Sequence, residues 1–288
     1  MNKALEDMLG SYNPKTPLDW LQATREVVQE IALLGFWRSG FFEYAAFYGG
    51  TALRVFHGLR RFSEDLDFSL LDRESGEHLE PALDHVKREL AAWGFTFTAE
   101  SKPATPTAAI ESAFLKGNTR VNLLNISVDE QLGNRFPNNR KIIIKLELET
   151  NTPPYASTEV KTQLMPTPFQ VRVYDLPSLF AGKLHALLFR NWKSRVKGRD
   201  FYDFVWYISR DVPVNLPHLE ARIKGNGSGD MGKLDIPMLH NLLKNRFKSI
   251  NIKAAGEEVR PFLRDPKELE LWSEQFFLEL AEKCRIQE

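Results

Sequence analysis

The pattern of apolar and polar residues predicts helices mixed with strands in the first half of the chain. A helix is predicted to begin at Thr16-Pro17 and to end at Gly35, since five apolar residues recur at helical spacing: Leu21, Val27, Val28, Ile31 and Leu34. A second helix is predicted from Glu77 to Trp93. Apolar runs predict strands over Phe41–Tyr48, Phe62–Leu71, Phe95–Ala99, Ala113–Leu115, Arg120–Val128, Lys141–Glu149 and Phe169–Tyr174. These elements predict an α+β fold.

After a proline-rich passage that starts at Asn151, the pattern becomes mainly helical. Asp175 is suited to cap a helix and Pro177 to lie in its first turn. Further helices are predicted over Pro217–Lys224, Ile236–Ile250 and Pro266–Arg285. We therefore predict two domains, residues 1–165 with the strands and residues 166–288 with mainly helices, and an active site between them.

Composition narrows the class of protein without naming a function. The chain has 288 residues, 43% of them hydrophobic, which is enough for real cores. Lysines and arginines number 38 and so do the acids, which argues against attraction of the whole protein to nucleic acid but allows a local basic patch. The single cysteine, Cys284, excludes an internal disulfide framework and a cysteine zinc cluster. Neither a signal peptide nor a membrane span is visible, so we expect a cytoplasmic protein without a membrane partner.

Two glycines and two aspartates carry the candidate chemistry. Asp65 and Asp67 are two residues apart on a predicted strand, so both carboxylates point to the same side. Hard divalent cations such as Mg²⁺ bind carboxylate oxygens and complete their coordination with substrate phosphates. Gly49 and Gly50 precede a segment that can start a helix at Thr51, where exposed amide groups can approach a phosphate. A phosphate site beside a metal site suggests phosphoryl or nucleotidyl transfer, whereas the plain alternative is a glycine turn with solvated acids.

The same residues resemble the first motif of the nucleotidyltransferase superfamily. Gly-Gly-Thr-Ala-Leu from Gly49, followed by Arg-x-Ser-x-Asp-Leu-Asp-Phe from Arg61, is similar to the AbiEii family of type IV toxin–antitoxin and phage-abortive systems. The resemblance implies a nucleotidyltransferase fold with a mixed sheet in the N-terminal domain and a helical C-terminal domain that completes the active site. It also implies that Gly49, Gly50, Thr51 and Ser63 line the nucleotide site.

Nucleotidyltransferases typically add a third carboxylate from a neighbouring strand. Alternation over Lys141–Glu149 places Ile144, Leu146 and Leu148 on one face and three charged residues on the other: Lys145, Glu147 and Glu149. Glu147 is the first candidate and Glu149 the second. The alternative is a half-buried strand whose polar face is solvated.

Two further motifs of the family resemble the stretch from Lys183 to Asp203. By that resemblance Lys183 contacts the nucleotide phosphates, and either Asp200 or Asp203 is the acid of the fourth motif. Lys183 could instead be a solvated helix lysine. Asp200 could instead cap the helix that follows, where its charge suits the helix dipole.

A basic loop follows the helix that bears Lys183. We assign Arg190, Arg195, Lys197 and Arg199 to RNA binding, since the loop contains no acid and includes Trp192. A solvated charge run is the alternative. Binding through these residues would weaken steeply with salt.

These assignments predict an Mg²⁺- or Mn²⁺-dependent nucleotidyltransferase that uses a nucleoside triphosphate. The family resemblance implies an RNA acceptor, with transfer RNA the obvious candidate, and a cognate antitoxin as partner. One alternative is an enzyme that modifies a small molecule such as an antibiotic. Another is a non-catalytic module that binds nucleotide or protein, although two crowded carboxylates argue against it.

Overall fold

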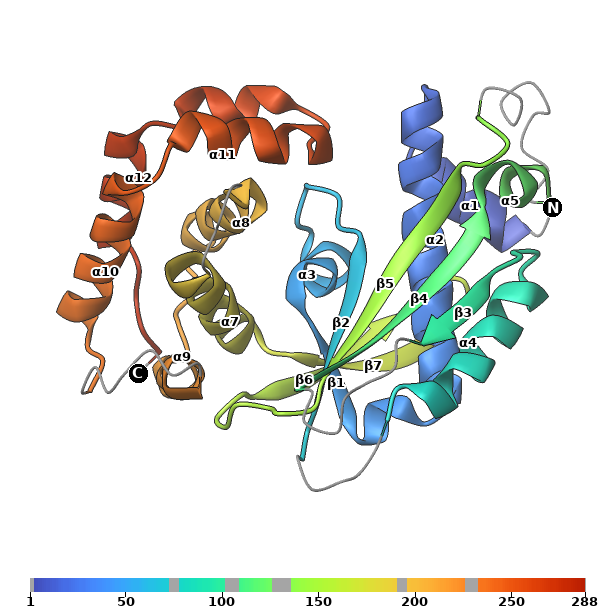
Figure 1. Cartoon of the computed structure of the whole chain (residues 1–288), viewed down its shortest axis with the longest axis horizontal. Helices are drawn as coiled ribbons and strands as arrows, with labels where there is room; N and C mark the ends of the chain where they lie inside the picture. The colour runs from blue at the N-terminus through green and yellow to red at the C-terminus, as the bar shows by residue number, and fades with distance from the viewer. Residues whose placement is uncertain are drawn as a thin grey trace. The chain divides into compact units, whose positions relative to one another are not determined.

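The computed structural model describes residues 3–72, 78–101, 109–125, 136–190, 196–225 and 233–287. The chain divides into two compact units (Figure 1). The first comprises Met1–His57, Ser63–Thr152 and Glu159–Val173, and the second comprises Gly58–Phe62, Pro153–Thr158 and Tyr174–Glu288. Each unit is therefore built from segments that are distant in the sequence.

The first unit is organised around a seven-stranded sheet of order β3-β4-β5-β2-β1-β7-β6. The strands are β1 Ala45–Tyr48, β2 Asp65–Leu70, β3 Thr98–Ser101, β4 Ile110–Asn118, β5 Lys141–Glu149, β6 Thr158–Gln163 and β7 Phe169–Tyr174. β2 pairs antiparallel with β1 and parallel with β5, and β1 pairs parallel with β7. The sheet is therefore mixed, as predicted. The bounds predicted for β5 and β7 are confirmed, while β6 was not predicted.

Helices α1 Lys3–Ser11, α2 Pro17–Arg38, α3 Gly49–His57, α4 Glu80–Ala92 and α5 Thr119–Asn125 complete the first unit. The predicted start of α2 is confirmed by a capping box, in which Asp19 N donates to Thr16 Oγ1 and Thr16 N donates to Asp19 Oδ2. The predicted end at Gly35 is wrong by a turn. A Cβ at Gly35 would lie 2.6 Å from Val86 Cα, so this glycine lets α2 approach α4 and does not stop the helix.

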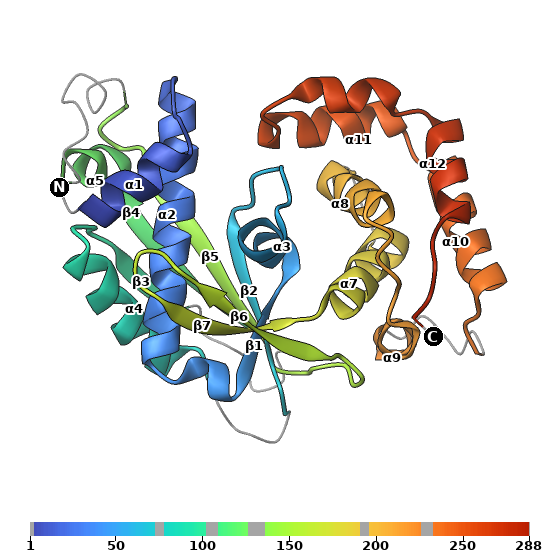
Figure 2. The ribbon, with the colours of Figure 1, turned by 180° about the vertical axis from the view of Figure 1, so that it is seen from behind.

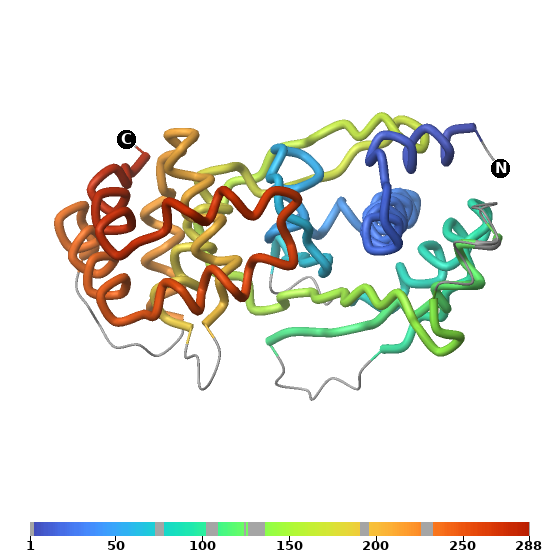
Figure 3. Tube along the Cα trace, turned by 90° about the horizontal axis from the view of Figure 1, so that it is seen from above, coloured from blue at the N-terminus to red at the C-terminus, as the bar shows by residue number. Residues whose placement is uncertain are grey.

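Aromatic side chains fill the space between α2 and the sheet. The ring centroid of Phe68 on β2 lies 4.7 Å from that of Phe36, 5.0 Å from that of Phe41 and 5.4 Å from that of Phe47. Figure 2 shows α2 lying across this face of the sheet, and Figure 3 shows α2 end-on to one side of β4 and β5. Since Phe68 faces α2, the neighbouring Asp67 points to the opposite face of the sheet.

The second unit consists of α7 Leu176–Phe189, α8 Gly198–Ser209, α9 Leu216–Gly225, α10 Ile236–Lys248, α11 Ile252–Val259 and α12 Glu274–Glu282, with 3₁₀ turns at Arg260–Phe262 and Pro266–Leu271. Asp175 caps α7 as predicted, since its Oδ1 accepts from Ser178 N at 2.9 Å. Phe180 of α7 stacks on Tyr207 of α8 with ring centroids 4.3 Å apart. Gly198 opens α8 against α11, where a Cβ would lie 1.8 Å from Ala255 O.

Three predicted elements are wrong, and local capping explains two of them. Residues 120–125 of the expected Arg120–Val128 strand lie in helix α5, because Asn118 Oδ1 accepts from Val121 N and starts a helix. Residues 126–128 lie outside the described residues. The Pro266–Arg285 helix is broken, since Ser273 Oγ accepts from Phe276 N and begins α12. The Phe41–Tyr48 strand is shorter than predicted, because Phe41–Glu43 form a 3₁₀ turn after Gly40.

The helices in the described ranges do not meet the requirements for crossing a membrane. None of them combines the length and the apolar character that a membrane span requires.

Candidate active site

Asp65 and Asp67 stand on β2 beside the buried core residues. Leu66 and Phe68 are fully buried, whereas Asp65 and Asp67 are half-buried on the other side of the strand. The tight core on one side fixes the strand, so the two carboxylates share one face as the spacing predicted. This arrangement concentrates negative charge at a place that solvent and ligands can still reach.

Gly49 lies directly against the carboxylate of Asp67. Its φ is +83°, and a Cβ built on it would come within 2.3 Å of Asp67 Oδ2. Only glycine therefore fits this position, both for its backbone conformation and for its lack of a side chain. β1 delivers the chain to this point, because Tyr48 is the register partner of Asp67. The predicted glycine turn and the predicted aspartates are thus brought together.

Thr51 fastens the start of α3 to β2. Its side chain is buried, and its Oγ1 donates a short hydrogen bond to the backbone oxygen of Asp65. Ser63 is also buried just before β2, and its backbone oxygen accepts from Gln29 Nε2 at 3.2 Å. Both hydrogen bonds are accepted by backbone oxygens at the start of β2, so they hold this strand without using the aspartate side chains.

The register of the sheet places Glu147 next to Asp67. In the parallel pairing of β2 with β5, Asp65 is opposite Lys145, Asp67 is opposite Glu147 and Ser69 is opposite Glu149. Glu149 points to the same face as Glu147 but lies two residues further along β5, opposite Ser69 and not opposite an aspartate. Lys145 Nζ lies 2.5 Å from Glu147 Oε1, so a cation already accompanies this carboxylate.

The donors at this face suit a hard divalent cation. Asp65, Asp67 and Glu147 offer carboxylate oxygens, and the missing side chain at Gly49 leaves room for the carboxylate of Asp67. Within the described ranges, no three His, Cys, Asp or Glu side chains converge closely enough to enclose a metal ion. Glu147 would have to exchange Lys145 for the metal, whereas the two aspartates already share one face.

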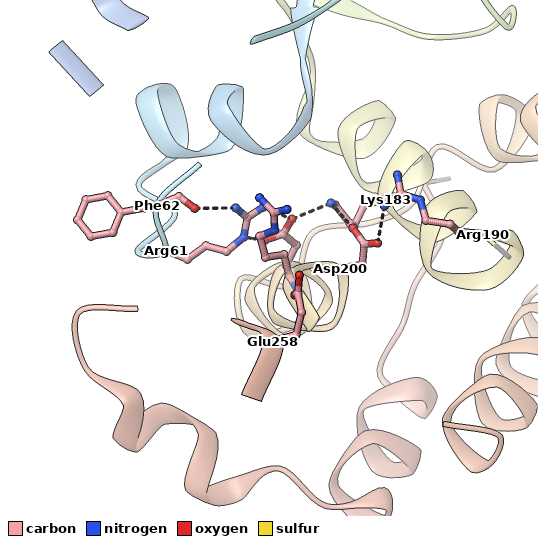
Figure 4. Close-up of polar contacts among 8 residues, drawn as sticks. Arg61, Phe62, Lys183, Arg190, Asp200 and Glu258 are labelled. Carbon is pink, nitrogen blue, oxygen red and sulfur yellow. Dashed lines mark hydrogen bonds and ion pairs between the residues drawn. The ribbon is translucent and has the colours of Figure 1, made fainter. Parts of the chain in front are cut away.

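Lys183, Asp200 and Asp203 form a buried ion-pair network in the second unit. Lys183 Nζ lies 2.8 Å from Asp200 Oδ1 and 2.8 Å from Asp203 Oδ2. Figure 4 shows Lys183 of α7 reaching Asp200 of α8, with Arg190 on the other oxygen of this carboxylate at 3.2 Å. Asp200 is the third residue of α8, whose N-cap is Lys197, so its alternative role as the cap is wrong.

Arg61 completes this network and was missed from the sequence. Its Nε and Nη2 each donate to an oxygen of Asp203 at 2.6 Å, and its Nη1 donates to Phe62 O at 3.0 Å. Only 2% of Arg61 and 0% of Asp203 is exposed, so the pair is shielded from water. The two residues are 142 positions apart, and no local pattern could have paired them.

Burial and pairing have opposite effects on the protonation of these groups. Burial would lower the pKa of Lys183, but Asp200 and Asp203 outweigh it, and the pKa is raised. Burial would raise the pKa of Asp203, but Arg61 and Lys183 outweigh it, and the pKa is lowered. Both groups therefore stay charged at neutral pH.

The predicted RNA-binding residues are only partly described. Arg195 lies outside the described residues, and Lys197 is the N-cap of α8. Arg199 N donates to Glu258 Oε2 at 3.3 Å, and its guanidinium carbon lies 4.4 Å from the ring centroid of Phe262. The role of these residues in RNA binding stays a prediction.

A mixed sheet with two aspartates on one strand and a glycine turn against them is the arrangement of a nucleotidyltransferase. Residues 31–280 match the family model described as "Nucleotidyl transferase AbiEii toxin, Type IV TA system". The chain therefore belongs to the AbiEii family of nucleotidyltransferase toxins, which confirms the predicted resemblance and enzyme class.

Solved structures share this fold at low sequence identity. JHP933 from Helicobacter pylori has a TM-score of 0.55 and 18% identity, over 91% of this chain and 90% of its own. An H. pylori protein proposed to be a nucleotidyltransferase has a TM-score of 0.54 and 18% identity, over 90% of this chain and 92% of its own. At this identity the likeness concerns the fold alone. No curated protein matches the chain.

Proposed function

We propose that this protein transfers a nucleotide from a nucleoside triphosphate to an RNA acceptor in a reaction that depends on Mg²⁺ or Mn²⁺. The observation that carries the proposal is the register of β2 and β5, which sets Glu147 beside Asp67 while Gly49 leaves room for the Asp67 carboxylate. This register favours Glu147 over Glu149 as the third carboxylate, because Glu149 pairs with Ser69.

The first unit would supply the metal and phosphate groups of the site. Asp65, Asp67 and Glu147 would hold a divalent ion, which neutralises phosphate charge when bound. The amide groups of Gly49 and Gly50 open α3, where backbone N–H groups and the helix dipole favour an anion. One of the carboxylates could accept the proton of the attacking hydroxyl.

Lys183 would stabilise the charge that develops on the pyrophosphate leaving group. Asp200 and Asp203 keep it protonated through the two ion pairs, and this charged state is the one the role requires. We assign to Asp200 or Asp203 the fourth-motif role, as the family resemblance implies.

Membership of a type IV toxin–antitoxin family supports a cognate antitoxin as partner. The target that we propose is RNA in the cytoplasm. Transfer RNA is our candidate acceptor. Arg190, Arg195, Lys197 and Arg199 would contact its phosphates, and this basic charge suits a polyanion better than a drug-sized acceptor.

The direct test is incubation of the protein with total cellular RNA and each labelled nucleoside triphosphate. We expect Mg²⁺ or Mn²⁺ to support labelling of RNA, and excess EDTA or Asp67→Asn to abolish it. Asp72→Asn is the matched control, since Asp72 is exposed just after β2 and should retain activity. Label transferred to an aminoglycoside but never to RNA would overturn the acceptor, and full activity of Asp67→Asn would overturn the mechanism.

A further inference from the structure

A cavity of about 550 Å³ lies within the second unit, apart from the residues assigned above to transfer. Tyr202 and Trp206 of α8, with Arg210 at its C-cap, form one wall, and Trp272 and Phe276 contribute another. Arg60 and Glu268 add charge to its lining. This volume falls in the range of about 300–1,000 Å³ that small ligands occupy in proteins.

The aromatic side chains of this cavity are suited to stacking. Trp272 and Phe276 are half-buried, so their rings are held by the fold yet remain partly accessible. Trp206 is 7% exposed, and its indole Nε1 meets no hydrogen-bond acceptor in the part of the chain that the structure describes. Flat aromatic surfaces stack nucleobases of any sequence, because every base has a π-face.

The charged side chains of this cavity favour an anion. The guanidinium carbon of Arg210 lies 4.6 Å from the ring centroid of Trp206, which orients this exposed arginine along the wall. Arg60 Nη1 is 3.7 Å from Glu268 Oε1, a loose contact for a side chain that is 80% exposed. Glu268 Oε2 accepts from Tyr202 OH at 2.6 Å. The lining of the cavity therefore contains two guanidinium groups and one carboxylate, and the carboxylate is already hydrogen-bonded.

We propose that this cavity binds an unpaired nucleotide of the RNA acceptor. The base would stack on the aromatic wall of Trp272 and Phe276, and Arg60 and Arg210 would contact the flanking phosphates. An aromatic wall with an excess of guanidinium groups matches a flat, anionic ligand better than a neutral apolar segment of a protein. The inference rests on the proposed function, since it names how that reaction's acceptor is recognised.

Binding of a short, fluorescein-labelled single-stranded RNA to the full chain, measured by anisotropy without triphosphate or metal, tests the proposal. Phe276→Ala should weaken binding by about 5- to 150-fold, the range for losing one stacked base. Arg210→Gln removes an exposed side chain that should not affect folding, and it should lower the salt slope by about 0.7. Arg260→Gln is the matched control, because Arg260 pairs with Glu257 on the surface and does not line the cavity.

A probe of the same length with abasic sites separates base stacking from charge. We expect Phe276→Ala to bind this probe as the parent protein does, while Arg210→Gln still binds it more weakly. Unchanged binding of the normal probe by both variants, or equal losses of Phe276→Ala with both probes, would overturn the site. If the cavity variants weaken RNA binding but the intact protein labels no RNA, the proposed transfer fails and the binding site stands.

Discussion

Two pairs of aspartates in this molecule have the same chemistry and opposite surroundings. Asp65 and Asp67 are half-buried on one face of β2, next to a glycine that leaves space for a carboxylate. Asp200 and Asp203 are 4% and 0% exposed on α8, where Lys183 bridges both. The first pair remains within reach of solvent, whereas the second pair is enclosed together with the cations that match its charge.

The difference follows from what burial costs a charge. A carboxylate shielded from water must be paired and hydrogen-bonded, and Arg61 and Lys183 satisfy both oxygens of Asp203. A half-buried carboxylate keeps part of its surface in contact with solvent, so a ligand can reach it. The buried pair therefore organises the fold of the second unit, while the half-buried pair is the better candidate for chemistry.

The largest effect is expected from Arg61→Ala, which removes the bidentate partner of a fully buried carboxylate. The free energy of unfolding should fall by about 3–5 kcal/mol, because the Asp203 charge is left without its main compensation. Urea unfolding followed by circular dichroism measures it. Arg260→Ala removes an exposed ion pair and should leave the free energy of unfolding nearly unchanged. Similar losses in the two variants would remove the distinction between buried and exposed pairs.

Lys183→Gln tests whether the network also takes part in catalysis. Turnover per folded molecule should fall by on the order of 10²-fold, the effect of losing one electrostatic stabiliser of the transition state. Binding of the triphosphate and turnover are to be measured separately, with the folded fraction determined by circular dichroism. A variant that is destabilised but turns over at the parent rate would show that Lys183 acts only on the fold.

Gly49→Ala should disturb the Asp67 carboxylate itself. A methyl group there would meet Asp67 Oδ2, and displacing this oxygen should lower activity by up to about 10²-fold. Gly94→Ala is the matched control, because Gly94 has a φ of +87° but its Cβ would find only Asn125 O at 4.0 Å. The two variants should be strained equally in their backbones, and only Gly49→Ala should lose activity. Equal activities would mean that Asp67 can move without consequence.

Much of the fold and half of the site follow from local pattern. The capping box at Thr16, the alternation over Lys141–Glu149 and the cap at Asp175 are encoded within a few residues, and the structure contains all three. The glycine turn and the aspartates also belong to one short stretch of sequence, and the pairing of Tyr48 with Asp67 brings Gly49 next to Asp67.

What could not be predicted depends on contacts between distant segments. The register that sets Glu147 rather than Glu149 beside Asp67 is decided by the packing of the whole sheet. Arg61 belongs by sequence to the motif that contains Asp65 and Asp67, but its guanidinium donates hydrogen bonds to Asp203, which is 142 positions away. Gly35 was predicted to end the helix, but it lies within α2 at the point where this helix packs closely against α4.

The smallest change in the free energy of unfolding is expected for Asp67→Asn, and comparison with Asp203→Asn distinguishes the two pairs of aspartates directly. Asp67→Asn should change the free energy of unfolding by no more than about 0.5 kcal/mol, or raise it slightly, because it removes charge from a half-buried, crowded face. The same substitution at Asp203 should lower it by about 3 kcal/mol or more, since Arg61 and Lys183 would lose a buried counter-charge. Thermal and urea unfolding of both variants beside the parent measure the difference. A loss for Asp67→Asn as large as that for Asp203→Asn would show that the half-buried and the buried aspartates contribute equally to stability, which would remove the distinction between the two pairs.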